Sequence, residues 1–213
     1  MENEDLSQYV GERVKVLVIG SHPDDIELGA GGTVAKHVSA GDEVHFLVLT
    51  YGEKGGDKIE RKREAERSAE ILQVKSLNFG EIEDTRITDG IETILKIEKS
   101  IDKICPDRVY TQCVQDRHQD HRNTAYATFS AARRVPEVFS YESPDSYPNF
   151  VPQYYVQVSD TIETKIRALN QFNSQQPKRF LESDAIKGLA MFRGYQVGIP
   201  YAEAFEVVRI IQL

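Results

Sequence analysis

The sequence predicts an α/β protein: a Rossmann-like, mostly parallel sheet with helices on both faces. Short apolar runs that do not alternate with polar residues indicate strands buried on both faces, as in parallel sheets. Segments with apolar residues at helical spacing follow these runs in turn, and this β-α-β-α order is typical of a parallel sheet. The 213 residues show no break in composition, so we expect a single domain over residues 1–213.

The expected elements follow one another along the chain. The first strand, residues 14–19, is continuously apolar, and Gly41 ends the helix after it. A later helix over 91–104 carries isoleucines at helical spacing and ends before Pro106. On the same grounds we expect further strands at 44–50, 75–80, 107–112 and 204–213, and further helices at 27–40, 59–73, 123–134, 162–172 and 184–192. Residues 136–152 are rich in Pro, Ser and Tyr and are expected to be irregular.

Composition and charge argue against several classes of partner. Lys plus Arg number 26 and Asp plus Glu 34, a net charge of −8 that is poorly suited to a phosphate backbone, so we expect no nucleic acid. No apolar stretch approaches the roughly 18 residues of a membrane span, and the acidic residues 1–14 do not resemble a signal peptide. Cys105 and Cys113 flank an expected strand, too far apart for a disulfide. Reduced thiols predict a cytoplasmic location.

Two polar clusters follow two of the expected strands. His22, Asp24 and Asp25 come directly after the first strand, and "QDRHQDH", residues 115–121, follows the strand at 107–112. In open parallel sheets, ligands bind beyond the carboxyl ends of the strands. Three of the five histidines fall in these clusters. We therefore expect the two clusters to converge on a site at one edge of the sheet.

A metal centre is the chemistry that the clusters share. Catalytic zinc takes three N or O ligands from the protein and leaves a position for water. His22, Asp25 and His121 would supply such a set for one Zn²⁺ or another divalent ion per chain. The pKa of the bound water would fall to about 7, which gives a nucleophile at neutral pH.

Each cluster also offers titratable groups beside the expected ligands. Asp24 would accept the proton of the water, and His118 would donate a proton or stabilise a developing oxyanion. Asp120 would hold the tautomer of His118. The alternative is that Asp24 caps the first helix and Asp120 caps the helix expected near Asn123. Because both clusters follow buried strands, we favour a functional site over two helix caps.

Two further features surround the first cluster. The glycines of "GAGG", residues 29–32, do not fit the dinucleotide motif G-x-G-x-x-G and instead indicate close packing of the first helix on the sheet. Arg61 continues the apolar stripe of its helix toward the carboxyl edge of the sheet, where it could bind a substrate hydroxyl or carboxylate. The alternative is an arginine whose head extends into water.

These residues resemble a known family. "SHPDDIELGAGGT" resembles the A-H-P-D-D-E/I-E-L-G-x-G-G-T motif of the PIG-L/LmbE-type deacetylases, and "HQDH" resembles their H-x-D-H motif. "EKGG…RKREAERSAEIL" and "YAEAFEVVR" also look like family segments, so the resemblance covers nearly the whole chain. Ser21 stands where the commonest form of the first motif has Ala.

The resemblance implies a zinc-dependent hydrolase that removes the N-acetyl group from an N-acetylglucosamine-containing sugar or glycoside, such as the GlcNAc-malate substrate of the bacillithiol pathway. By position it implies the same metal ligands, with Asp24 as base, His118 as acid or oxyanion partner, Asp120 as its orienting residue and Arg61 as a substrate contact. The expected partner is a small N-acetylated amino sugar, and family members are often homo-oligomers.

Two other functions compete with this interpretation. A metal-dependent hydrolase of another bond, such as a phosphoester, would often use two metals about 3.5–4 Å apart with bridging carboxylates. A non-catalytic sugar-binding module would hold its metal in a site closed by four protein ligands. One metal with an open position beside Asp24 would count against both.

Overall fold

A computed structural model describes residues 13–176 and 178–212 of the chain. Its seven-stranded sheet has the order β3-β2-β1-β4-β5-β7-β6. The strands are β1 (Lys15–Gly20), β2 (Glu43–Val48), β3 (Ser76–Phe79), β4 (Arg108–Gln112), β5 (Glu137–Tyr141), β6 (Tyr154–Gln157) and β7 (Ala202–Ile210). Strands β1 to β5 are parallel, whereas β7 runs antiparallel to both β5 and β6. The predicted mostly parallel sheet is confirmed.

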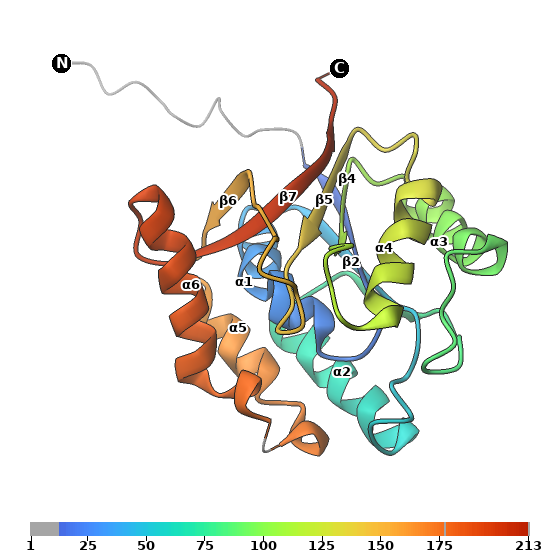
Figure 1. Ribbon diagram of the computed structural model, residues 1–213, viewed down its shortest axis with the longest axis horizontal. Helices are drawn as coiled ribbons and strands as arrows, with labels where there is room; N and C mark the ends of the chain where they lie inside the picture. The colour runs from blue at the N-terminus through green and yellow to red at the C-terminus, as the bar shows by residue number, and fades with distance from the viewer. Residues whose placement is uncertain (1–12, 177, 213) are drawn as a thin grey trace.

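Helices cover both faces of this sheet (Figure 1). They are α1 (Asp25–Ser39), α2 (Lys58–Leu72), α3 (Ile91–Ile104), α4 (Gln119–Ala131), α5 (Ile162–Leu169) and α6 (Ser183–Val197). One core lies between the sheet and the group α1, α2, α5 and α6; the other lies between the sheet and the pair α3 and α4. The continuously apolar β1 contributes to both cores, with Val16 and Val18 on one side and Leu17 and Ile19 on the other.

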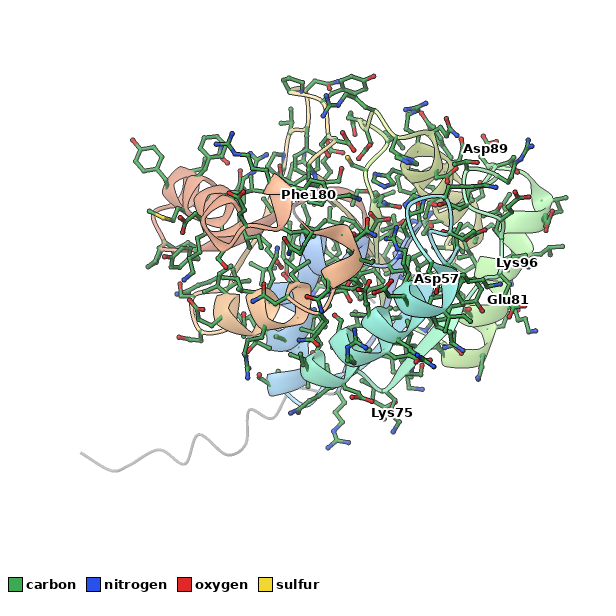
Figure 2. The ribbon with its side chains drawn as sticks, turned by 90° about the horizontal axis from the view of Figure 1, so that it is seen from below. Asp57, Lys75, Glu81, Asp89, Lys96 and Phe180 are labelled. Atoms are coloured by element: carbon green, nitrogen blue, oxygen red, sulfur yellow. The ribbon has the colours of Figure 1, made fainter. Side chains whose placement is uncertain are left out.

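Local sequence signals set the start of α2 and the packing of α1. Asp57, labelled at the beginning of α2 in Figure 2, caps that helix with Oδ1, which accepts hydrogen bonds from the backbone N–H of Ile59 and Glu60 at 3.0 and 2.9 Å. In α1, a Cβ on Gly29 would lie 2.0 Å from the Tyr141 ring. The glycine therefore permits close packing of α1 on the sheet, as the sequence predicted.

The strand order places a topological switch point beside β1. After β1 the chain adds β2 and β3 on one side, and it then returns to place β4 and β5 on the other. Ligands bind at such points because the loops that follow the two neighbouring strands diverge and leave a crevice. The two polar clusters follow β1 and β4, so the topology brings them together.

The C-terminal third departs from the predicted elements. Residues 137–141, expected to be irregular, form β5, a strand of the sheet interior whose last four residues are buried. The run is only five residues long and is followed by polar turn residues, so composition hid its β-branched and aromatic pattern. The edge strand β6 was also not predicted. Helix α4 begins at Gln119 rather than near residue 123.

Three further expectations concern the chain ends, the cysteines and membrane spans. The acidic N-terminal segment lies almost wholly outside the described residues, so the single domain over 1–213 stays a prediction at both ends. Cys105 and Cys113 are both free thiols. Within residues 13–176 and 178–212, none of the helices has the length and apolar character that crossing a membrane requires.

Candidate metal centre and active site

The first side of the site is the turn between β1 and α1. Asp24 precedes the helix with φ 97° and ψ −26°, a left-handed conformation that Asp tolerates better than most residues. Its side chain makes no capping hydrogen bond, so the predicted alternative of a simple helix cap is wrong. Asp25 is the first residue of α1, where the backbone N–H groups favour a carboxylate.

The second side is the loop between β4 and α4. His118 takes the N-cap position, and its Nδ1 accepts a hydrogen bond from the backbone N–H of Asp120 at 3.2 Å. Asp120 and His121 therefore lie in the first turn of α4, facing the turn after β1. Because α4 begins four residues earlier than expected, Asp120 is not a helix cap.

The three predicted metal ligands come together. Nδ1 of His22 lies 3.2 Å from Oδ2 of Asp25, and Nε2 of His121 lies 3.3 Å from Oδ1 of the same carboxylate. One ligand atom from each residue falls within a group whose members lie within 4.8 Å of one another. Two imidazoles thus direct one nitrogen each toward a single carboxylate.

The other nitrogen of each imidazole also faces carboxylates. Nε2 of His22 lies 3.1 Å from Oδ1 of Asp84 and 3.2 Å from Oδ2 of Asp120, and Nδ1 of His121 lies 3.0 Å from Oδ2 of Asp116. Carboxylates in this position accept the remaining ring N–H and leave the inner nitrogen unprotonated for a metal. The donor set and its supporting carboxylates therefore fit a divalent ion.

Asp120 contacts a different partner from the one predicted. Its Oδ2 is 3.2 Å from Nε2 of His22 and accepts a hydrogen bond from the backbone N–H of Thr85 at 2.9 Å. The carboxylate makes no hydrogen bond to the ring of His118 among the described contacts. Asp120 orients His118 only through its backbone N–H, so the expected side-chain contact between the two is wrong.

Asp24 lies buried beside the ligands, with 7% of its surface exposed. Burial raises the pKa of Asp24 to about 6, although the positive charge of Arg61 opposes the shift. The guanidinium Nη2 of Arg61 is 3.6 Å from Oδ2 of Asp24. At neutral pH this carboxylate is therefore ionised but close to its pKa, as a general base requires.

Arg61 is held inside the site rather than extended into water. Its Nη2 donates to the carbonyl oxygen of Pro23 at 2.7 Å, and its Nη1 donates to that of Gly52 at 3.1 Å. Two observations favour glycine at position 52. A Cβ there would lie 2.6 Å from the guanidinium carbon of Arg61, and the backbone has a φ of 66°, which side chains rarely adopt. The alternative of an exposed arginine is wrong, because only 4% of Arg61 is exposed.

The carboxylates of the cluster create a strongly negative electrostatic environment around the two imidazoles. Burial lowers the pKa of His121, but Asp25 and Asp116 outweigh it and raise the value to about 9. The pKa of His22 is likewise raised well above its ordinary value, since Asp25, Asp120 and Asp84 outweigh burial. Carboxylates that attract protons to these imidazoles attract a divalent cation to the same place.

A cavity of about 280 Å³ opens onto the ligands. Asp24, His118 and Arg61 line it together with the three ligand residues. Its rim is polar, so it suits a hydroxylated molecule of small size. The remaining polar lining residues are Lys54, Asp84, Thr85, Asp145, Gln175 and Lys178.

Sequence reasoning missed three residues that support the ligands: Asp84, Asp116 and Gln112. Asp116 lies within the second cluster, where only its histidines and Asp120 were given roles. Asp84 follows β3, and the rule that loops after parallel strands carry functional groups would have indicated it. Gln112 ends β4 and donates a hydrogen bond from Nε2 to Oδ2 of Asp25. Nothing in its local pattern distinguishes it from an ordinary strand residue.

Fold and site together define a Rossmann-like α/β protein with a candidate divalent-metal centre at the switch point of its sheet. The chain belongs to the PIG-L family: the family model described as GlcNAc-PI de-N-acetylase matches residues 17–132. The family prediction from the sequence motifs is confirmed.

Individual relatives agree with the family match. The chain is 36% identical to the uncharacterized deacetylase YaiS of Escherichia coli (strain K12), over 79% of this chain and 96% of the relative. It is 30% identical to the diacetylchitobiose deacetylase of Thermococcus kodakarensis, over 91% of this chain and 83% of that one. The structure of N,N'-diacetylchitobiose deacetylase from Pyrococcus horikoshii is similar with a TM-score of 0.82 at 26% identity, covering 96% of this chain and 87% of that one.

Proposed function

We propose that this chain is a metal-dependent N-deacetylase that hydrolyses the acetamide of a small N-acetylglucosamine-containing sugar or glycoside. The observation that carries the proposal is the convergence of His22, Asp25 and His121 in a polar cavity, with the buried carboxylate of Asp24 beside them. Membership of a deacetylase family and the deacetylase relatives support the same reaction.

The proposed metal is one Zn²⁺ held by His22, Asp25 and His121. Two imidazoles and one carboxylate form a common catalytic zinc set, which leaves a position open. When bound, the ion would supply Lewis-acid chemistry, polarising the amide carbonyl and making water more acidic.

Asp24 is the proposed general base. Its carboxylate lines the cavity next to Asp25, and at pH 7 it is ionised, with a pKa of about 6. It would take the proton of the attacking water and can return it to the leaving amine.

His118 is the proposed partner of the developing oxyanion. Since its Nδ1 accepts the N–H of Asp120, the neutral ring carries its proton on Nε2. Burial, followed by the charges of His121 and His22, lowers the pKa of His118 and favours this neutral form. Nε2–H would then donate a hydrogen bond to the developing oxyanion, while the proton taken up by Asp24 would go to the leaving amine.

Arg61 and Asp120 have proposed roles that differ from the simplest expectation. The hydrogen bonds of Arg61 to Pro23 and Gly52 support a role in fixing the turn that carries Asp24. A direct contact between Arg61 and substrate stays a prediction, supported by its place in the cavity wall. Asp120 would fix the ring of His22 through Oδ2 and that of His118 through its N–H.

The competing functions are less well supported. The two candidate ligand groups in the described residues share His22, which disfavours two independent metals for a phosphoester hydrolase. A purely structural metal would not require Asp24 and His118 beside an open three-residue set. The cytoplasmic location and the homo-oligomer stay predictions.

The decisive experiment measures amine release from a panel of N-acetylglucosamine derivatives, with metal-stripped and zinc-restored protein side by side. The panel contains simple glycosides, the malate conjugate and nucleotide sugars. We expect release from at least one compound, only in the presence of zinc. No release from any compound, in protein shown to hold one zinc, would refute the proposed acetamide substrate class.

A further inference from the structure

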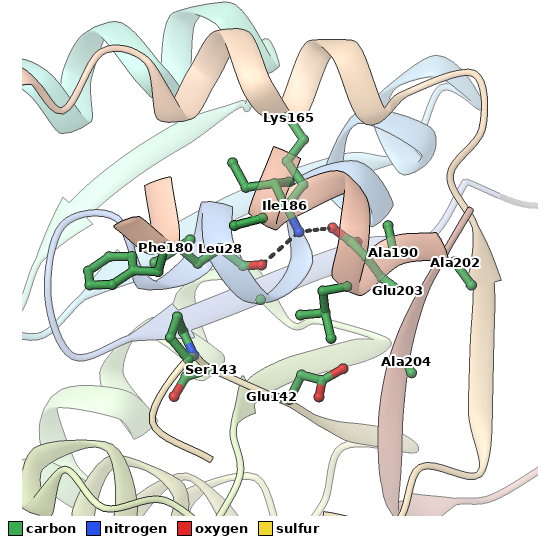
Figure 3. A pocket seen from close by; sticks show the side chains of 14 residues that line it. Leu28, Glu142, Ser143, Lys165, Phe180, Ile186, Ala190, Ala202, Glu203 and Ala204 are labelled. Atoms are coloured by element: carbon green, nitrogen blue, oxygen red, sulfur yellow. Dashed lines mark hydrogen bonds and ion pairs between the residues drawn. The ribbon is translucent and has the colours of Figure 1, made fainter. Parts of the chain in front are cut away.

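A second cavity, of about 150 Å³, adjoins the candidate active site (Figure 3). Leu28, Pro144 and Phe180 line both cavities. Leu28 follows Asp24 by one turn of α1, and a helical turn rises only about 5.4 Å. The second cavity therefore lies directly beside the catalytic pocket, with these three residues common to both walls.

The walls of the second cavity are mainly apolar. Helix α6 contributes Ile186, Leu189 and Ala190, and strand β7 contributes Ala202 and Ala204. Figure 3 shows Ala190, Ala202 and Ala204 on the side of the cavity away from Phe180. The catalytic pocket, by contrast, is lined by carboxylates, imidazoles and basic groups.

The charged side chains of this second cavity are neutralised by partners. Nζ of Lys165 donates to Oε1 of Glu203 and to the carbonyl oxygen of Leu28, each at 2.6 Å, as the dashed lines in Figure 3 mark. Glu142 pairs with Arg193 at 2.5 Å. Lys165 and Glu203 are each only 5% exposed. A ligand with a charge of its own would find no unpaired counter-charge there.

We propose that this second cavity binds an apolar aglycone of the substrate, about the size of a phenyl ring. The inference rests on the proposed function. In that function the acyl group is a small acetyl group bound at the metal, so the second cavity would hold the substituent on the sugar rather than the acyl group. An apolar cavity of about 150 Å³ is large enough to hold a benzene molecule. The polar catalytic pocket would hold the sugar ring, and the apolar cavity would select its substituent.

The test compares kcat/KM of the zinc-loaded protein for methyl and phenyl N-acetylglucosaminides in both anomers. The malate conjugate is included as a substrate with a charged aglycone. Because the aglycone is remote from the amide, its electronic effect on hydrolysis is small. We expect the phenyl glycoside to exceed the methyl glycoside by about tenfold or more, since even one buried methylene group changes kcat/KM by about tenfold.

Two variants locate the effect. Ala190→Leu fills the cavity from α6, and Leu189→Trp narrows it at a residue that is 40% exposed and so tolerates a larger side chain. Each is expected to bring the phenyl-to-methyl ratio to within about twofold of one. The matched control is Leu95→Trp on α3, which is 54% exposed, does not line the cavity and should keep the wild-type ratio.

The outcomes separate this inference from the proposed function. A wild-type ratio near one, or a preference for the malate conjugate, would overturn the apolar aglycone while leaving the deacetylase assignment intact. A high ratio that survives both cavity variants would place the aglycone elsewhere and also overturn it. If Ala190→Leu does not fold, the phenyl-to-methyl ratio of Leu189→Trp alone tests whether the aglycone binds in this cavity. No turnover of any N-acetyl sugar would reject both.

Discussion

Gln112 donates a hydrogen bond from Nε2 to Oδ2 of Asp25 at 2.9 Å, and so joins the end of β4 to the start of α1. Ser21 donates from Oγ to Oε1 of Gln112 at 2.6 Å, which fixes the orientation of the amide. The backbone N–H of His22 binds the same Oδ2 at 2.8 Å. Oδ1 of Asp25 is thereby turned toward Nε2 of His121. The orientation of Asp25, a proposed metal ligand, therefore depends on a buried amide outside both sequence motifs.

Gln112→Leu is expected to weaken zinc binding by about 10- to 100-fold, the usual cost of losing a group that orients a metal ligand. Leucine keeps much of the volume but removes the amide donor, which leaves Oδ2 of Asp25 with only the backbone N–H and the ring of His22. Affinity is measured by competition with a chromogenic chelator. The control is Gln171→Leu, because the side chain of Gln171 donates to the backbone carbonyl of Arg167 in α5 and not to the site. Equal affinities for the two variants would remove Gln112 from the metal site.

Asp24→Asn should keep its zinc and lose turnover by about 10²- to 10⁴-fold, the usual contribution of a general base. The amide has the same shape as the carboxylate but cannot accept the proton of the attacking water. Zinc content by elemental analysis and kcat on the best substrate of the panel are measured together. Turnover at the wild-type rate would assign the base to another residue.

His121→Ala should abolish stoichiometric zinc binding, because it removes one of three ligands. His45→Ala is a matched control, since His45 lies on β2 and bonds to Ser76 rather than to the site. Zinc content is measured after dialysis against a weak chelator. A His121→Ala protein that retained one zinc would contradict the proposed ligand set.

Much of the site could be predicted because its signals are local. A continuous apolar run identifies a buried strand, and the residues directly after β1 and β4 then lie at one edge of any parallel sheet. That reasoning placed His22, Asp25 and His121 correctly. Asp24 and Arg61 were also correctly placed beside them, since their positions follow from helix spacing and the same edge.

The remaining features depend on contacts between distant segments. Whether Asp120 faces His118 or His22 is decided by Thr85, whose N–H binds the carboxylate from 35 residues away. Strand β5 is recognisable only because β4 and β7 pair with it on either side. The β-branched and aromatic residues of the five-residue β5 are too few to outweigh the Pro, Ser and Tyr content of residues 136–152, so composition favoured an irregular segment.

Arg61→Lys should lower kcat by about tenfold or more while zinc content stays at one, because a lysine is a point charge that cannot replace the planar fork between Pro23 and Gly52. The turn that carries Asp24 would lose its fixed position. Steady-state kinetics separate the two proposed functions of Arg61. A rise in KM at unchanged kcat would instead indicate that Arg61 binds substrate and does not position Asp24.

His37 provides a test of stability away from the metal site. Near the end of α1, its Nδ1 lies 2.7 Å from Oδ2 of Asp42 and its Nε2 lies 3.1 Å from the hydroxyl of Tyr110. Burial lowers the pKa of His37, and the opposing effect of Asp42 is smaller. The folded protein therefore holds this imidazole neutral at a pH where the unfolded chain, with a pKa of about 6.5, has begun to protonate it.

The unfolded state binds more protons at His37 than the folded state, so this residue makes stability fall as pH decreases from the unfolded pKa of about 6.5 toward the lower folded pKa. The slope is at most about 1.4 kcal/mol per pH unit, the value for one proton. His37→Gln keeps a hydrogen-bonding side chain and removes the titration. Its destabilisation relative to wild type should therefore be larger at pH 7.5 than at pH 5.5. Urea unfolding of both metal-free proteins at the two pH values measures this difference, and an equal destabilisation at both would show that His37 does not titrate differently in the folded state.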